Sequence, residues 1–314
     1  MFNFSSIPFI GEIFSLACAV IWGFSVVLFK KVGETVSPIA LNPFKSLVGI
    51  VLFGVTLVVL GVPFIQPIVS DPQMGFTLRD YLILTISGVI GIGLADTIFF
   101  KSLNILGASI AAIVDCLYSP SIIVFAYFML GERLAPVQLA GGALIVVSVL
   151  FASLKIKHIS VSRKQFEYGV FLGAISMIMM AFSIVLIKPI LNRIVDDPSL
   201  QLWVGGFRMI PGVIVAGGIF LIYNRKRNLT TPFKSKKILA ILLIGSVLGG
   251  YLALAMWIFG MTLTKSSIAG ILNQTSVIFM VLFGWWILKE PITKRRIVAF
   301  LMALFGILLV FLGK

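Results

Sequence analysis

The chain is a succession of apolar runs, each separated from the next by a few polar residues. An α-helix needs about twenty apolar residues to cross the hydrocarbon core of a bilayer. Ten runs reach this length, at 10–30, 38–61, 80–101, 107–130, 134–154, 167–190, 199–223, 237–261, 266–288 and 295–313. The pattern predicts an all-α polytopic membrane protein with ten transmembrane helices, referred to below as spans one to ten.

The second half of the sequence repeats the first at a constant distance of 158 residues. The identities fall in spans one, three and four, and include Phe24, Ser25, Lys30, Ser109, Phe125 and Glu132, which recur as Phe182, Ser183, Lys188, Ser267, Phe283 and Glu290. The repeat predicts two five-helix domains, 1–155 and 166–314. Because five is odd, the second unit enters the membrane inverted, as in secondary transporters with a binding site near the midplane.

Composition agrees with lipid as the solvent, since 60% of the 314 residues are hydrophobic and only 11% are charged. The net charge of +14 lies in short loops, which is typical of topology signals and headgroup contacts and argues against a nucleic-acid partner. Cys18 and Cys116 lie in apolar runs, and His158 lies in a basic loop. We therefore expect no disulfide, metal site or cofactor. The first run lacks a basic leader, so we expect a retained span.

Short motifs carry a family resemblance. The sequence resembles the drug/metabolite transporter (DMT) superfamily, EamA type, in three short motifs. These are Trp22-Gly23 in span one, the endings Gly131-Glu132 and Lys289-Glu290 of spans four and nine, and a basic residue within the second span of each half. The resemblance covers almost the whole chain. It implies a ten-helix transporter, with no enzymatic activity. One departure is Lys45, where the family pattern leads us to expect arginine; a point-like ammonium does not reproduce a bidentate guanidinium.

The orientation in the membrane has two conflicting indications. Loops after odd-numbered spans carry seventeen Lys and Arg residues, and the other loops with the termini carry six. The positive-inside rule then places the odd loops in the cytoplasm and both termini outside. The family resemblance implies cytoplasmic termini instead.

Three ionisable residues of the first half are predicted to lie at one depth. Counted at 1.5 Å per residue, Lys45, Asp96 and Asp115 lie roughly 8–12 Å below the same surface. A charge inside a membrane needs a reason, and two carboxylates beside one ammonium leave a negative excess. That excess suits a proton or an ammonium-bearing substrate. Two alternatives stay open: a purely structural Lys45–carboxylate pair, and an Asp96 that reaches interfacial water beside Lys101.

The second half offers a different set of polar groups. Asn273 occupies the repeat position of Asp115, Gln274 follows it, and Arg208 is the clear midspan charge. Together with the aromatics Trp22 and Tyr118, these residues complete the predicted substrate-binding or coupling set. A zwitterion would place its amine toward Asp115 or Asp96 and its carboxylate toward Arg208. The alternatives are an Arg208 that snorkels to the interface and aromatics that only pack.

These features favour a secondary active transporter that moves a small polar or amphipathic metabolite by alternating access, with proton coupling compatible with the buried carboxylates. No P-loop pattern indicates ATP. A lipid-intermediate flippase on the same fold is one alternative. A membrane enzyme is another, for which Asp196-Asp197 is the only adjacent acidic pair. We expect a multi-pass protein of the cell (plasma or inner) membrane, monomeric or homodimeric, whose partners are a small-molecule substrate and the lipid bilayer.

Overall fold

The computed structural model describes residues 7–106, 111, 114–153, 162–227, 235–288 and 294–313, and these form helices with short connections. The first half contains α1 (Ile10–Gly33), α2 (Pro38–Val59), α3 (Leu78–Ser87), the π-helix η2 (Gly88–Ala95), α4 (Asp96–Leu106), α6 (Tyr118–Leu130) and α7 (Pro136–Ser153). The second contains α8 (Arg163–Leu186), α9 (Lys188–Arg193), α10 (Pro198–Arg227), α11 (Lys236–Ser246), the π-helix η4 (Val247–Leu252), α12 (Ala253–Leu263), α13 (Ser266–Asn273), α14 (Ser276–Leu288) and α15 (Lys294–Leu312).

Seven helices of the described chain are long and apolar enough to cross a membrane, and three shorter apolar helices, Tyr118–Leu130, Pro136–Ser148 and Ile297–Leu312, accompany them. The all-helical architecture is confirmed, while the count of ten spans stays a prediction. Several runs are composite. Elements α3, η2 and α4 follow one another through a single span, and α11, η4 and α12 do the same 158 residues later.

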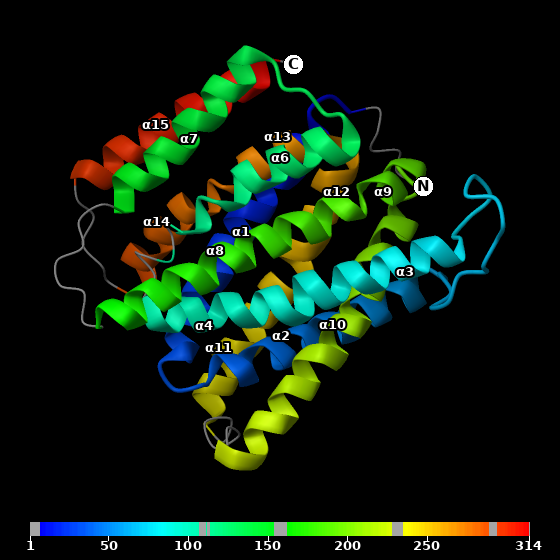
Figure 1. The fold of residues 1–314 in the computed structure, drawn as a ribbon, viewed down its shortest axis with the longest axis horizontal. Coiled ribbons are helices and arrows are strands. Elements are labelled where there is room, and N and C mark those ends of the chain that lie inside the picture. Colours follow the sequence, from blue (N-terminus) through cyan, green and yellow to red (C-terminus); the bar gives the residue numbers. More distant parts are fainter. Residues whose placement is uncertain are drawn as a thin grey trace.

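The two halves are interleaved. Helix α1 of the first half packs mainly against α12 and α14 of the second, α8 packs against α4 and α6, and α2 packs against α10 (Figure 1). Helices α7 and α15 lie side by side at one flank of the molecule. The two sequence repeats therefore build one helical body, with its inner space between elements of both halves.

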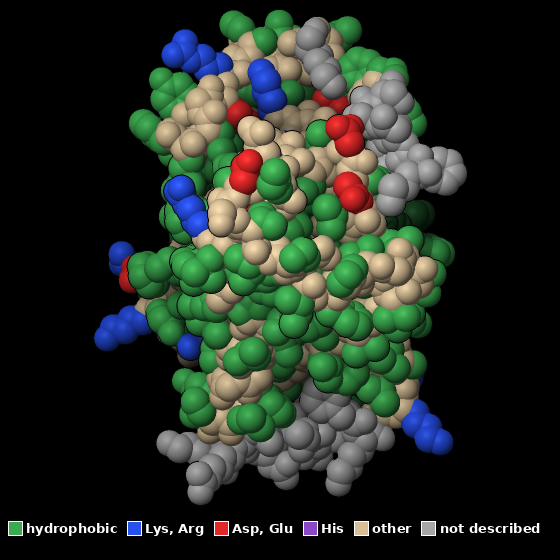
Figure 2. Space-filling model, turned by 90° about the vertical axis from the view of Figure 1, so that its right-hand side faces the viewer, with side chains coloured by type: hydrophobic (Ala, Val, Ile, Leu, Met, Phe, Trp, Pro, Cys, Tyr) green, Lys and Arg blue, Asp and Glu red, His purple; other side chains and the backbone are tan. Residues whose placement is uncertain are grey.

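Connections gather at two ends of this body (Figure 1). We call end A the end that holds 7–9, 60–77, 131–135, 194–197 and 264–265, and end B the opposite end, where α1, α4 and α10 finish and α8, α11 and α15 begin. Figure 2 looks onto end A, where acidic and basic side chains lie together. The basic residues of end B include Lys30, Lys31, Lys101, Arg163, Lys164, Lys236, Lys237, Lys294 and Arg295.

Local signals explain several helix starts. Thr77 and Asp80 form a capping box at the start of α3, and Ser162 and Gln165 form one at the start of α8. Before α10, Asp197 Oδ1 accepts hydrogen bonds from the N–H groups of Ser199 (3.0 Å) and Leu200 (3.1 Å). The acidic pair Asp196-Asp197 therefore includes an N-cap, which explains its place before a helix.

Two features of the sequence lead to predictions that the structure corrects. Proline removes a helical hydrogen bond, so the sequence predicts that Pro43 and Pro211 interrupt spans two and seven, yet α2 and α10 run on through them. Helices α2 and α10 pack against each other, and a proline inside a membrane helix is tolerated where neighbouring helices surround it. Lys188 is one of the six basic residues that the charge count above assigns to the even-numbered loops and the termini, yet it is buried. Its ammonium donates to the backbone carbonyls of Met261, Thr262 and Thr264 at the end of α12. A cation there satisfies carbonyls that have no partner within the helix.

Candidate functional site

A central cavity lies midway along the spanning helices and is lined by both halves of the chain. The volume open to the centre of a water molecule is about 150 Å³, which leaves room for a small solute. All eight residues singled out from the sequence line it: Trp22, Lys45, Asp96, Asp115, Tyr118, Arg208, Asn273 and Gln274. The structure thus brings the set together, while the roles of its members stay predictions.

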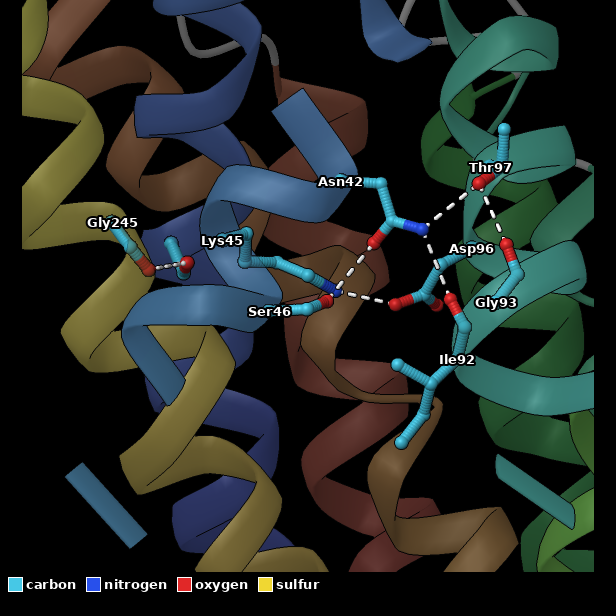
Figure 3. Close-up of polar contacts among 9 residues, drawn as sticks. Asn42, Lys45, Ser46, Ile92, Gly93, Asp96, Thr97 and Gly245 are labelled. Carbon is cyan, nitrogen blue, oxygen red and sulfur yellow. Dashed lines mark hydrogen bonds and ion pairs between the residues drawn. The ribbon is translucent and has the colours of Figure 1, made fainter. Parts of the chain in front are cut away.

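Lys45 and Asp96 form an ion pair on one wall of the cavity (Figure 3). Both side chains are largely withdrawn from solvent, with 6% of Lys45 and 14% of Asp96 exposed. The Lys45 ammonium also lies 5.7 Å from the centroid of the Trp22 ring and 5.4 Å from that of Phe100. The sequence left open an Asp96 that reaches interfacial water beside Lys101; in the structure Lys101 donates to the Tyr168 hydroxyl at 3.0 Å.

The π-helix η2 helps to place this pair. A π-helical turn replaces the regular ladder of an α-helix, and such turns are frequent at functional sites. Asn42 of α2 donates to the Ile92 carbonyl of η2 (3.0 Å) and to the Thr97 hydroxyl (2.9 Å), which itself donates to the Gly93 carbonyl (Figure 3). This network fixes α2 against η2 and α4. Lys45, one turn after Asn42 on α2, therefore meets Asp96 at the start of α4.

Arg208 of α10 enters the cavity from the second half and is buried, with 3% of the residue exposed. Its Nε donates to Ser87 Oγ at 2.9 Å, and Ser87 Oγ in turn donates to the Ser183 carbonyl. Its Nη1 is buried and has no hydrogen-bond partner in the described structure. The side chain therefore does not snorkel to the interface, and it presents an unused donor inside the protein.

Asp115 is joined to the other half through Gln274. Gln274 Nε2 donates to Asp115 Oδ2 at 3.1 Å, and Asp115 forms no ion pair with any described residue. The buried Gln274 Oε1 and Asn273 Oδ1 have no hydrogen-bond partner in the described chain. The sequence repeat places Asn273 opposite Asp115, but the direct bond comes from the next residue, Gln274.

Both spans that carry these groups are broken at this level. Span nine consists of α13 and α14, with a turn at Gln274-Thr275 between them. Span four has the equivalent turn at Cys116-Leu117, directly before α6 begins at Tyr118. In secondary transporters, discontinuous helices of this kind place half-helix ends at the midplane, where they contact substrate or ions.

Sequence reasoning missed several lining residues. Ser46, Phe99, Met177, Met180, Ser183 and Ser276 all face the cavity. Serine, methionine and phenylalanine are common packing residues of membrane helices, so a single sequence offers little signal for them. Ser183 did stand out as the repeat mate of Ser25, but identity within a repeat does not say which side of a helix faces the cavity. Glu290 and His158 lie outside the described residues.

The chain was compared with protein families, curated proteins and solved structures. Residues 9–154 and 167–312 each match the model of the EamA-like transporter family, so the two matches together cover most of the chain. A search of curated proteins finds no match. One solved crystal structure superposes with a TM-score of 0.75 over 95% of each chain, at 14% sequence identity, which shows a shared fold.

Proposed function

Since the chain belongs to the EamA-like transporter family, we propose that it is a secondary transporter that moves a small zwitterionic metabolite through the central cavity. Proteins of this family are transporters of the DMT type, and the apolar helices make the chain an integral, multi-pass membrane protein. The family match confirms the resemblance stated from the sequence. Substrate, coupling and mechanism are the parts that we propose.

The proposed zwitterionic substrate is supported mainly by the balance of charge in the cavity. Lys45 and Asp96 neutralise each other, which leaves the guanidinium of Arg208 and the carboxylate of Asp115 as the lining charges without an ion-pair partner among the described residues. The cavity is thus neutral in sum but holds one cation and one anion ready for a ligand. A solute of net charge would leave one of them buried and uncompensated, which is costly. A zwitterion compensates both.

The remaining lining suits the body of such a solute. Trp22, Tyr118 and Trp257 supply aromatic faces, and Met177 and Met180 supply adaptable apolar surface. The unpartnered amide oxygens of Asn273 and Gln274 accept hydrogen bonds and would therefore favour donor groups on the ligand. Few polar groups within a mainly apolar lining are typical of small-molecule sites.

The repeat architecture supports transport by alternating access. Two inverted units around one central cavity allow access to each side in turn by rocking of one unit against the other. Proton coupling fits the same site, because a proton and the ammonium of a substrate would compete for the Asp115 carboxylate. ATP is not required in this scheme.

The test combines a ligand screen with one substitution. A thermal-shift screen of the purified protein against metabolite pools at two pH values should find stabilisation by zwitterionic solutes, since a ligand that binds only the folded state stabilises it by mass action. Asp115→Asn should then abolish or strongly reduce uptake or efflux, with folding and expression intact. Undiminished transport by this variant would remove Asp115 from the mechanism. Stabilisation by a lipid-linked intermediate alone would favour the flippase.

A further inference from the structure

Half-helix α13 connects end A with the central cavity. Its eight residues, Ser266–Asn273, span about 12 Å at 1.5 Å per residue. The N-terminus lies at end A, and the C-terminus delivers Asn273 and Gln274 to the cavity. Because the turn at Gln274-Thr275 separates α13 from α14, α13 can tilt without carrying α14 with it.

Glu132 of the first half holds the N-terminus of this half-helix. Its Oε1 accepts from the N–H of Ser266 at 2.8 Å, and its Oε2 accepts from the N–H (2.9 Å) and the hydroxyl (2.8 Å) of Ser267. A carboxylate at the positive end of a helix makes strong, charge-assisted hydrogen bonds. Gly131 makes this contact possible, because its left-handed φ of 67° ends α6 and turns Glu132 toward α13.

Three further residues, Lys188, Glu12 and Arg133, form hydrogen bonds to the turn before α13. Lys188 donates to three carbonyls at the end of α12, and Thr264 Oγ1 donates to Glu12 Oε1 of α1 at 2.9 Å. Lys265 Nζ donates to the Arg133 carbonyl at 2.9 Å. Glu12, Glu132 and Arg133 belong to the first half, and the turn to the second, so these bonds tie the two halves together at end A.

The other end of α13 contacts the first half inside the cavity. Gln274 Nε2 bonds Asp115, while Gln274 Oε1 and Asn273 Oδ1 have no partner in the described chain. A ligand that engages these groups, or that displaces Gln274 from Asp115, pulls on the C-terminal end of α13. Its N-terminal end is fixed by Glu132. Because α13 is one short helix, a displacement of its C-terminal end by a ligand would be transmitted to its N-terminal end at end A.

We propose that Glu132 is the latch of a gate at end A, and that α13 couples release of this latch to ligand binding at Asp115 and Gln274. Glu132 is a positioning residue in this scheme, since it acts through α13 and does not touch the ligand. The proposal rests on the transport function proposed above, because a gate has meaning only for a cavity that opens to one side. It adds the element that controls which side is open.

Cys18 provides a built-in reporter, because it lines the cavity and the only other cysteine is Cys116. In a Cys116→Ala background, the rate at which a membrane-impermeant methanethiosulfonate reagent modifies Cys18 is measured from each side of the membrane. Asp71→Cys at end A and Arg163→Cys at end B, each in a protein without other cysteines, identify which side is which. Glu132→Gln should raise the Cys18 rate from the end A side at least tenfold, and leave the rate from the end B side within twofold.

Two further variants complete the design. Glu167→Gln removes an exposed carboxylate paired with Arg163 at end B, and should leave both rates unchanged. Ser267→Ala removes only one of the three bonds to Glu132, so it should raise the end A rate by a smaller factor and remains informative if Glu132→Gln fails to fold. Unchanged rates in both latch variants, or equal increases from both sides, would overturn the proposal.

The labelling needs no substrate, so it separates the gate from the proposed function. A selective increase at end A supports the latch even if no zwitterion stabilises the protein, in which case the proposed substrate class alone is wrong. If the screen succeeds, the stabilising zwitterion added to the protein with Glu132 intact should change the end A rate at least threefold. No change would contradict the coupling through α13.

Discussion

The Lys45–Asp96 pair permits a quantitative test of how the cavity wall is built. The substitutions are Lys45→Met, Asp96→Leu and the double variant, which exchange the two charges for apolar groups of similar size. Each single change leaves one charge in a largely buried site, since 6% of Lys45 and 14% of Asp96 are exposed. Removal of one partner of a buried ion pair costs about 3–5 kcal/mol.

We expect the loss of stability in each single variant to lie near the lower end of that range. After Asp96→Leu, the Lys45 ammonium still faces the rings of Trp22 and Phe100 at 5.7 and 5.4 Å, and each such contact is worth about 0.5–1 kcal/mol. After Lys45→Met, the remaining Asp96 carboxylate is the more exposed of the two groups, at 14%. We therefore expect each single variant to lose about 3 kcal/mol and the double variant to lose about 1 kcal/mol, because apolar replacement of a whole pair is often nearly neutral. The interaction free energy is then about 5 kcal/mol.

The assay is reversible unfolding of the purified protein in mixed micelles, followed by far-UV circular dichroism for all four members of the cycle. Transport by the double variant should stay within tenfold of the parent, since Arg208 and Asp115 hold the ligand in our account. Additive losses in the cycle would refute the ion pair as the main interaction of the two side chains. Loss of transport in a stable double variant would show that the pair itself takes part.

Other substitutions test the packing and the cap interactions. Gly49→Ala should destabilise by about 1–3 kcal/mol through overpacking, because a Cβ on Gly49 would lie 2.5 Å from the Gly250 carbonyl oxygen. Gly217→Ala is the control, since a Cβ there meets no atom within 4 Å beyond the local backbone of its own helix. Equal stability of the two variants would contradict the close approach of α2 and η4. Lys188→Met should lower stability by about 2–3 kcal/mol, because the carbonyls that end α12 lose a charged donor; Lys164→Met at the exposed start of α8 should change it by less than about 0.5 kcal/mol. Similar thermal unfolding of the Lys188 and Lys164 variants would mean that Lys188 is not a structural cap.

Much of the fold follows from sequence periodicity. The ten apolar runs agree with the helices to within a few residues wherever both ends are described, because a bilayer of fixed thickness dictates their length. The 158-residue offset places η2 and η4, as well as the broken spans four and nine, at equivalent positions. The π-helical form of η2 and η4 was not predictable, because a uniformly apolar pattern does not distinguish π-helical from α-helical turns. The hydrogen bond from Asn42 to the Ile92 carbonyl of η2 is likewise a contact that only the fold reveals.

The site shows where sequence reasoning stops. Depth counting put Lys45, Asp96 and Asp115 in one layer, and the structure places all three on one cavity. Depth alone does not fix rotation about a helix axis, so it left open which carboxylate pairs with Lys45. Lys188 was misplaced for a related reason: it lies near the end of an apolar run, and burial there depends on the carbonyls of a helix more than 70 residues away.

The central claim is that Arg208 and Asp115 together select a zwitterion. The most direct measurement is the thermal shift of the purified protein with free amino acids and betaines, compared with the α-amides and N-acetyl derivatives of the amino acids that stabilise it. At a ligand concentration of one hundred times Kd, binding adds about 2.7 kcal/mol to stability. Our account predicts stabilisation by at least one zwitterion, none by its singly charged derivatives, and loss of the effect in Arg208→Met. Equal stabilisation by an amide or an N-acetyl derivative, or no stabilisation by any zwitterion, would contradict it.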